Sequence, residues 1–354
     1  MNDRNGYLLE VQDLRVYFPI LRGFLRRQIG SVKAVDGVSF QIRRGETLGL
    51  VGESGSGKTT TGRAIARVFQ PTDGTILFHP ESGATLNVGS LQKEELHEYW
   101  KNVQVIFQDP YASLNPRRTV MQIIEEPLMI LGGMGPAERR LRVRELLSLV
   151  GLDARHAERY PHAFSGGQRQ RIGIARGIAL NPHLLIADEA VSALDVSVQG
   201  QVLNLMVKLQ KELDLAYLFI SHDLGVVKHV SDRIAVMYVG KIVELASSSS
   251  LFRRPRHPYT EALLSAVPRA DPSHSLKRMV LGGEVADPAN RPKGCCFHPR
   301  CQYAKEICRT DEPPIRRIGD SADGNKHFVA CHFAEQLELT PATAKYSPPV
   351  ADPR

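Results

Sequence analysis

The chain has 354 residues, of which 42% are hydrophobic and 23% are charged, as in an ordinary soluble globular protein. No run approaches the roughly 18 consecutive apolar residues that cross a bilayer, and from the polar start of the chain we expect no secretory signal. We therefore expect one large domain with an extension, or two domains, in a cytosolic chain that reaches a membrane only by docking to another protein.

The chain is basic, with a net charge of +7 and an isoelectric point of about 9.2. Its Lys and Arg residues are spread along the sequence without interleaved aromatic residues, so the pattern predicts no nucleic-acid partner. A surface near anionic lipid headgroups is the more natural interpretation of this charge.

The first part of the chain has the pattern of strands. Residues 8–18 alternate apolar and polar side chains, residues 19–31 are basic and indicate a loop, and residues 32–42 indicate a second strand. Residues 47–51 (TLGLV) form a short, continuously apolar run bounded by glycine, which is typical of a buried parallel strand. A glycine-rich segment and a helical pattern follow directly.

The middle of the chain alternates between helical and strand patterns. Residues 91–179 are mostly helical in pattern. Further buried strands are expected at residues 184–189 and 216–223, separated by an amphipathic helix at residues 201–213. This alternation predicts an α/β core with a largely parallel sheet.

The sequence changes character near residue 246. Residues 233–245 indicate two edge strands with a turn at Gly240. After residue 246 proline becomes frequent, the helical pattern weakens, and all five cysteines appear, between Cys295 and Cys331. Cytosolic chains rarely use disulfides, so this clustering indicates a metal site.

Residues 52–59 (GESGSGKT) fit the pattern G-x-x-x-x-G-K-[ST] and stand between an expected strand and an expected helix. In such a loop the backbone N–H groups surround phosphate oxygens, and glycines keep side chains out of the way. Lys58 would reach the outer phosphates, and the Thr59 hydroxyl would bind Mg²⁺. The alternative is a chance match in a glycine-rich turn, which the strand and helix on either side argue against.

Four further polar residues follow apolar runs. Asp188 is placed to hold Mg²⁺ through water, and Glu189 to polarise a water for in-line attack on a terminal phosphate. The alternative is an acidic pair that only caps a strand. Gln108 is a weaker candidate for contact with Mg²⁺ and the attacking water. His222 is a candidate donor to the terminal phosphate, although a lone His is more often a structural residue.

A second glycine-containing helix start lies at residues 164–171 (FSGGQRQR). Ser165 stands at the N-cap position, and Gly166 and Gly167 expose backbone N–H groups, as in an anion site. One nucleotide needs only one phosphate cradle. Two cradles in one chain therefore predict that each completes a partner's site across a dimer.

Together these motifs resemble those of the ATP-binding-cassette (ABC) transporter ATPases, over residues 8–335. In chain order the segments are similar to the Walker A loop, the Q-loop, the family signature, Walker B, the D-loop at residues 192–195 and the switch histidine. Two positions depart from the family pattern, because Ala190 stands where proline is usual and Phe164 where leucine is usual. The resemblance implies ATP and Mg²⁺ as ligands.

The resemblance also implies a set of site residues. It implies catalytic roles for Lys58, Glu189 and His222, and stacking of adenine on Phe18. The residues that it implies at the nucleotide are Phe18, Gly52, Glu53, Ser54, Gly55, Ser56, Gly57, Lys58, Thr59, Thr60, Gln108, Ser165, Gly166, Gly167, Gln168 and Asp188. Those that it implies at Mg²⁺ are Thr59, Gln108 and Asp188.

The fold implied is a P-loop NTPase of the α/β class. Residues 1–246 would form an ABC nucleotide-binding domain, with a largely parallel mixed sheet, an antiparallel β subdomain and a helical subdomain at about 109–180. Residues 247–354 would form a small C-terminal extension that carries the cysteines.

Segments at residues 109–120, 160–172 and 256–264 resemble the oligopeptide/dipeptide branch of importers, most closely its "F" ATPase subunits. This implies an ATPase at the cytoplasmic face of the cell membrane that energises import of di- or oligopeptides. The partners implied are two membrane-spanning permease subunits, a second and non-identical ATPase, and an extracytoplasmic solute-binding protein. The alternatives are the same motor for nickel or another small solute, an exporter motor, or a cassette ATPase that acts on ribosomes or DNA.

This branch has a similar C-terminal cysteine pattern, and some members hold a [4Fe–4S] cluster there. The matching positions are Cys295, Cys301, Cys308 and Cys331, whereas Cys296 falls where the family has another residue. Zinc and no metal are the alternatives, although the sequence lacks the C-x-x-C pairs usual at zinc sites. ATP hydrolysis needs no redox centre, so the expected role is to stabilise the extension or the dimer.

Overall fold

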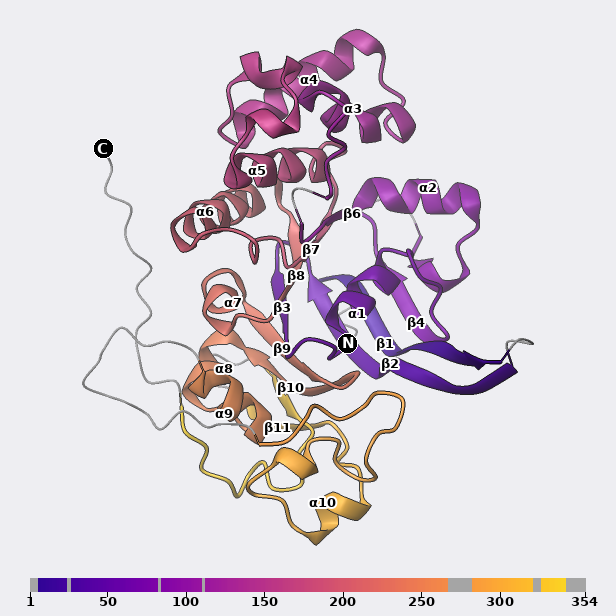
Figure 1. Cartoon of the computed structure of the whole chain (residues 1–354), viewed down its shortest axis with the longest axis vertical. Coiled ribbons are helices and arrows are strands. Elements are labelled where there is room, and N and C mark those ends of the chain that lie inside the picture. Colours follow the sequence, from indigo (N-terminus) through magenta and orange to yellow (C-terminus); the bar gives the residue numbers. More distant parts are fainter. Residues whose placement is uncertain are drawn as a thin grey trace.

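The computed structural model describes residues 6–23, 27–81, 84–109, 112–266, 282–320 and 326–341. Its centre is an eight-stranded sheet, with helices packed around it and a helical subdomain at one end (Figure 1). The strands of this sheet, in spatial order, are β11 (Arg316–Asp320), β12 (Lys326–Val329), β10 (Lys241–Ser247), β9 (Arg233–Tyr238), β3 (Thr47–Val51), β8 (Ala216–Ser221), β7 (Leu184–Asp188) and β6 (Val103–Ile106).

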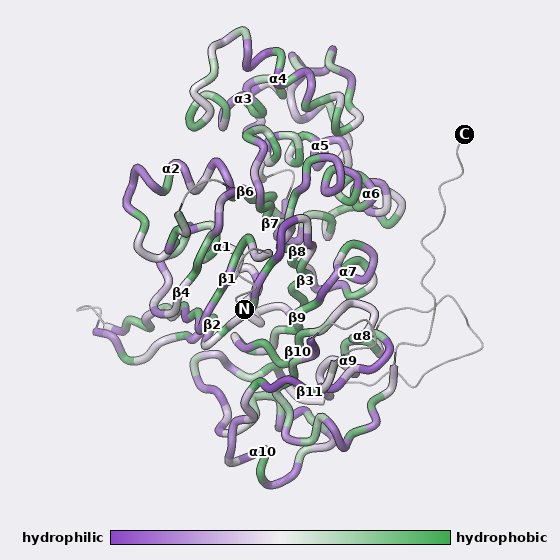
Figure 2. The backbone as a smooth tube through the Cα atoms, turned by 180° about the vertical axis from the view of Figure 1, so that it is seen from behind, coloured by the Kyte–Doolittle hydropathy of each residue, from purple (hydrophilic) through white to green (hydrophobic). Residues whose placement is uncertain are grey.

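The parallel part of this sheet is buried on both faces. Every residue of β3, β7 and β8 is buried, as their continuously apolar sequences predict. The hydrophobic residues gather along these central strands (Figure 2). Because β3, β7 and β8 run parallel, their carboxyl ends meet at one edge of the sheet, which brings Val51, Asp188 and Ser221 to the same level.

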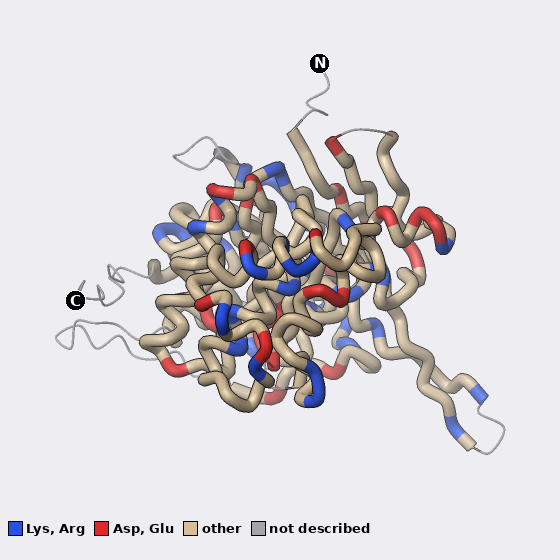
Figure 3. Tube along the Cα trace, turned by 90° about the horizontal axis from the view of Figure 1, so that it is seen from above, with Lys and Arg blue, Asp and Glu red and all other residues tan. Residues whose placement is uncertain are grey.

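A second sheet has the strand order β2-β1-β4-β5 and is antiparallel. Its strands are β1 (Tyr7–Arg22), β2 (Arg27–Arg43), β4 (Asp73–Phe78) and β5 (Leu86–Asn87). The prediction of a loop at residues 19–31 was wrong. Most of that segment pairs across a long hairpin, from Pro19 opposite Ser31 to Arg22 opposite Arg27, and the hairpin projects from the body of the protein (Figure 3).

The helices that cover the parallel sheet and form the helical subdomain follow in chain order. They are α1 (Lys58–Ile65), α2 (Lys93–Asn102), α3 (Val120–Ile130), α4 (Pro136–Leu149), α5 (Gly166–Gly177), α6 (Val196–Leu213) and α7 (Leu224–Val230), with short 3₁₀ turns η1 (Val88–Ser90), η2 (Ala154–Glu158) and η3 (Pro161–Ala163). Helices α3, α4 and α5 pack on one another at one end of the molecule (Figure 1). In the described part of the chain, no helix has the length and apolar character required to traverse a membrane.

The C-terminal part continues the main sheet instead of standing apart from it. It contains α8 (Ser248–Arg253), α9 (Pro258–Ser265), η4 (His298–Arg300) and α10 (Glu306–Thr310), followed by β11 and β12. Strand β12 pairs with β10, so the prediction that β9 and β10 are edge strands was wrong. Tyr259 and Phe297 belong to the same hydrophobic cluster as the parallel sheet, which joins the two parts in one core.

Candidate nucleotide site

A cavity of about 960 Å³ opens at the carboxyl edge of the parallel strands. The residues that line it and that the sequence also predicted are Gly52, Glu53, Ser54, Gly55, Gly57, Lys58, Thr59, Thr60, Gln108, Glu189 and His222. Ser56 is buried behind them. The fold thus gathers at one place residues that are far apart in the sequence, which is the arrangement expected for a ligand site at the end of a parallel sheet.

The loop at residues 52–57 depends on two glycines. Gly52 has φ 155°, and a Cβ there would lie 2.1 Å from the Met237 carbonyl oxygen. Gly57 has φ 102°, and a Cβ there would lie 2.2 Å from the Ala34 carbonyl oxygen. Both contacts are with backbone that cannot move aside easily, so any side chain would deform the loop.

Lys58 sits inside the curl of this loop. Its ammonium group donates to the carbonyl oxygens of Gly52 and Glu53, each at 2.8 Å, and to Ser56 Oγ at 3.2 Å. Burial lowers the pKa of Lys58. Helix α1 begins at Lys58, so its N-terminal end and this cation face the cavity together, as an anion site requires.

The Thr59 hydroxyl donates to Asp188 Oδ1 at 2.8 Å. Asp188 ends strand β7, and burial raises its pKa. A hydroxyl and a carboxylate held side by side offer hard oxygen ligands of the type that Mg²⁺ prefers. The geometry therefore fits the predicted pairing of these two residues at one cation.

Glu189, Gln108 and His222 meet at the cavity wall. Gln108 Nε2 donates to Glu189 Oε2 at 2.7 Å, and His222 Nδ1 lies 3.3 Å from Glu189 Oε1. Glu189 has φ 49°, in the left-handed region, and its N–H donates to the Ile220 carbonyl at 2.9 Å. A non-glycine residue held in that conformation stores strain, which is common at functional sites.

The segment at residues 165–168 lies elsewhere. Ser165 caps α5, with its Oγ accepting from Gln168 N at 3.4 Å while Gln168 Oε1 accepts from Ser165 N at 3.0 Å. None of Ser165, Gly166, Gly167 and Gln168 is among the residues that line the cavity. The chain therefore does not bring the two predicted phosphate cradles together.

Phe18 is also not among the lining residues. Its ring packs edge-on against Phe69, with ring centroids 5.5 Å apart. Its partner across the hairpin is Val32, which does line the cavity. The predicted stacking of adenine on Phe18 stays a prediction.

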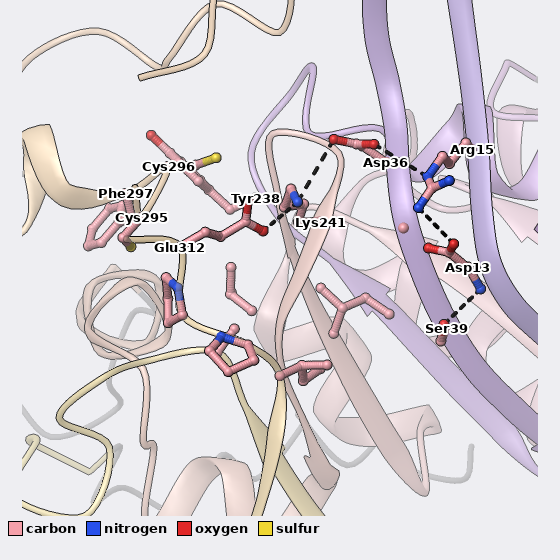
Figure 4. A pocket seen from close by; sticks show the side chains of 17 residues that line it. Asp13, Arg15, Asp36, Ser39, Tyr238, Lys241, Cys295, Cys296, Phe297 and Glu312 are labelled. Carbon is pink, nitrogen blue, oxygen red and sulfur yellow. Dashed lines mark hydrogen bonds and ion pairs between the residues drawn. The ribbon is translucent and has the colours of Figure 1, made fainter. Parts of the chain in front are cut away.

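The four predicted cysteine ligands line one small cavity of about 20 Å³, namely Cys295, Cys301, Cys308 and Cys331. Burial raises the pKa of the Cys295 thiol to about 12 and that of Cys301 to about 11. In the described ranges, no group of three or more His, Cys, Asp or Glu side chains is arranged to hold a metal ion. Cys296 instead lines a different pocket of about 250 Å³, across from Asp36 (Figure 4).

Sequence reasoning missed that the C-terminal extension contributes to the nucleotide cavity. Leu263, Val285 and Pro288 line it, and Arg300 and Tyr259 hydrogen-bond to Glu53. Tyr259 lies in the segment at residues 256–264, and Arg300 precedes Cys301. The sequence therefore related Tyr259 only to the oligopeptide/dipeptide branch and Arg300 only to the predicted metal site. Contacts between residues more than 200 positions apart leave no local signal.

Comparisons with known proteins identify the class. The sequence model of the ABC transporter family matches residues 35–192, and that of the oligopeptide/dipeptide transporter C-terminal region matches residues 243–308. A solved ATP-binding cassette, a dimer in a post-hydrolysis state bound to ADP and Pi, is 27% identical with a TM-score of 0.58, covering 68% of this chain and 98% of that one.

Two relatives are more similar over nearly the whole length. The oligopeptide transport ATP-binding protein AppF of Bacillus subtilis is 54% identical, over 92% of this chain and 97% of that protein. The dipeptide transport ATP-binding protein DppF of Escherichia coli is 46% identical, over 94% and 96%. The chain therefore belongs to the ATP-binding proteins of ABC transporters, in the oligopeptide/dipeptide branch.

Proposed function

We propose that this chain hydrolyses ATP to energise import of di- and oligopeptides across the cytoplasmic membrane. The observation that carries the proposal is one cavity that gathers residues of the 52–57 loop and the start of α1 with Gln108, Glu189 and His222. The similarity of this chain to an oligopeptide transport ATP-binding protein, at 54% identity, supports the solute class.

The polar groups at this site have separate roles in this proposal. The loop N–H groups and Lys58 hold the phosphates, for which Lys58 exchanges its loop carbonyl partners for phosphate oxygens. Thr59 and Asp188 hold Mg²⁺, which neutralises phosphate charge when it is bound. Glu189 accepts a proton from the attacking water, and His222 donates to the terminal phosphate.

Gln108 is the residue that orients Glu189 in this proposal. Its Nε2 donates to Glu189 Oε2, which leaves Oε1 facing His222. A carboxylate held by one amide donor keeps a free lone pair for a water proton, which suits a general base. Gln108 also lines the cavity, and its proposed further role is to contact Mg²⁺ and the attacking water once the nucleotide is bound.

The segment at residues 165–168 is proposed to close a nucleotide site on a second ATPase subunit. Its absence from the cavity of its own chain supports this, as does the dimeric state of the solved cassette of similar fold. The other proposed partners are two permease subunits, which would hold the chain at the cytoplasmic face of the membrane, and an extracytoplasmic solute-binding protein. Nickel or another small solute is the alternative cargo.

The four convergent cysteines are proposed to hold a [4Fe–4S] cluster. A single zinc ion binds each thiolate sulfur at a Zn–S distance of about 2.3 Å. In a [4Fe–4S] cluster, each of the four cysteines binds a different iron atom. The convergence of the four cysteines on one cavity is the observation behind this proposal. The cluster would cross-link the segments on either side of η4, helix α10 and the segment that follows β12.

The backbone around these cysteines supports the same proposal. Burial raises the pKa of the Cys295, Cys301 and Cys331 thiols. In each case the backbone N–H two residues further along the chain acts in the opposite direction and lowers the pKa. At Cys331 this contact is a hydrogen bond from Phe333 N to Sγ at 3.4 Å. Such N–H groups favour a thiolate, the form that binds iron.

Reconstitution tests the proposed function. The chain is purified with its co-expressed permease and ATPase partners, inserted into vesicles, and assayed for uptake of labelled di- and oligopeptides driven by ATP. Uptake that requires ATP and is lost with Lys58→Ala is expected. ATP hydrolysis that no peptide and no permease stimulates would contradict the transport role, and uptake of nickel chelates instead of peptides would select the alternative cargo.

A further inference from the structure

The strongest contact between the extension and the nucleotide cavity is an ion pair at Glu53. The Glu53 carboxylate accepts from both terminal nitrogens of Arg300, at 2.6 and 3.0 Å. The Arg300 side chain is only 6% exposed, and Glu53 is 29% exposed. A planar, two-bond pair of this kind fixes both the position and the orientation of the carboxylate.

A second contact fixes the main chain at the same residue. The Glu53 N–H donates to the Tyr259 hydroxyl oxygen at 2.8 Å. Tyr259 is fully buried, with its ring centroid 4.7 Å from that of Tyr238 and 5.3 Å from that of Phe297. The extension thus holds the second residue of the phosphate-binding loop by its backbone and by its side chain.

Glu53 needs such partners because it lines the cavity that receives a triphosphate. A carboxylate in the wall of a phosphate cradle repels the anionic ligand, and the repulsion is strong in a partly buried site. Arg300 supplies the compensating charge and draws the carboxylate toward the extension. Within the described residues, Arg300 is the only cation that forms an ion pair with Glu53.

We propose that Arg300 and Tyr259 are positioning residues of the ATPase, so that the extension is a working part of the nucleotide site. Arg300 neutralises Glu53 and turns it away from the phosphates. Tyr259 fixes the direction of the Glu53 peptide at the start of the loop. The proposal rests on the assignment of residues 52–59 as the phosphate cradle.

Removal of Arg300 separates this role from simple anchoring of the extension. Arg300→Met keeps much of the side-chain volume but leaves the Glu53 carboxylate unpaired, so ATP affinity is expected to fall about tenfold. The double variant Glu53→Gln with Arg300→Met removes the repulsion as well and is expected to return to within about threefold of Glu53→Gln alone. If Arg300 only anchored the extension, adding Glu53→Gln to Arg300→Met would not restore ATP affinity.

The measurement is displacement of a fluorescent ATP analogue by ATP on the full chain, with the melting temperature recorded for each variant. Lys58→Ala is the control for the cradle itself. If the wild-type chain binds no ATP, or Lys58→Ala binds it equally well, the cradle assignment fails. If these two behave as expected and Arg300→Met matches the wild type, the positioning role alone is overturned.

Two further variants keep the test decisive if Arg300→Met does not fold. Glu53→Gln removes the negative charge from the cavity wall and leaves Arg300 as an unpaired positive charge beside it. It is therefore expected to tighten ATP binding about twofold. A tenfold weakening would contradict the electrostatic role. Tyr259→Phe keeps the buried ring but removes the acceptor for the Glu53 N–H, and about a threefold weakening is expected; unchanged binding would remove Tyr259 from the proposal.

Discussion

Arg300 links the nucleotide cavity to the cysteine cavity, and the two cavities differ in size and in the state of their polar groups. Arg300 bonds to Glu53 of the first cavity and precedes Cys301 of the second. The nucleotide cavity is about 960 Å³ and its polar groups are already oriented by one another. The cysteine cavity is about 20 Å³, and burial raises the pKa of the Cys295 and Cys301 thiols that line it.

This difference suggests that the nucleotide cavity serves the proposed reaction and that the cysteine cavity serves the stability of the extension. The nucleotide cavity stands at the ends of buried strands, where a rigid sheet holds the proposed catalytic groups in place. The cysteines stand in the short helix α10 and in loops of the extension, which a bound metal would stabilise. A change in the first cavity is therefore expected to alter turnover, and a change in the second to alter stability.

The largest expected effect is at Glu189. Glu189→Gln removes the proposed base but keeps an oxygen and similar size, so turnover of the assembled complex is expected to fall about 100-fold or more while ATP still binds. Phosphate release and analogue displacement measure the two quantities. Turnover near the wild-type rate would show that the base lies elsewhere and would break the comparison on its chemical side.

The cysteines test the supporting side. Cys301→Ser is expected to abolish the visible absorbance and bound iron of anaerobically purified protein, and to lower its melting temperature, because one ligand of the proposed cluster is lost. Cys296→Ser is the matched control, since Cys296 faces the other pocket, and it is expected to keep the iron. A wild-type chain that is folded, colourless and free of iron would contradict the cluster.

A smaller effect is expected from pH at His257, which lines the cysteine cavity. Burial lowers its pKa from 6.5 to about 3, so the folded protein holds the neutral imidazole while the unfolded chain takes up a proton below pH 6.5. The contribution is fully present above pH 6.5 and is lost as the pH falls toward 3, by up to about 1.4 kcal/mol per pH unit.

His257→Asn isolates this effect. The His257 Nδ1 accepts from Tyr259 N at 3.0 Å, and the Asn side-chain oxygen offers a similar acceptor at the start of α9 without titrating. Urea unfolding at pH 7.5, 6.5 and 5.5 is expected to show a shallower loss of stability in the variant. Parallel losses in both proteins would assign the pH dependence to other groups.

The nucleotide site was largely predictable because its signals are local. An apolar run predicts each buried strand, and a residue of the site follows immediately, as Gly52 follows β3 and Glu189 follows β7. The meeting of Gln108 and His222 at Glu189 then follows from the parallel order of the strands.

The extension was predictable only in its cysteines. Strands β11 and β12 are short and polar, and only their pairing to β10 reveals them as part of the main sheet. The ion pair of Arg300 with Glu53 spans 247 positions, so it appears only after folding. Strands at residues 8–18 and 32–42 were predicted, but the outer part of the β1–β2 hairpin was missed. The basic, glycine-containing sequence of residues 19–31 indicates a loop until the two arms pair.

The central claim is that this chain contains two halves of two different nucleotide sites. Substitution of Ser165 by Arg tests it most directly, because Ser165 lies outside the cavity of its own chain. In the assembled complex, turnover is expected to fall about 100-fold, while the isolated variant binds ATP as tightly as the wild-type chain. Loss of ATP binding by the isolated variant, or turnover that survives in the complex, would contradict the claim.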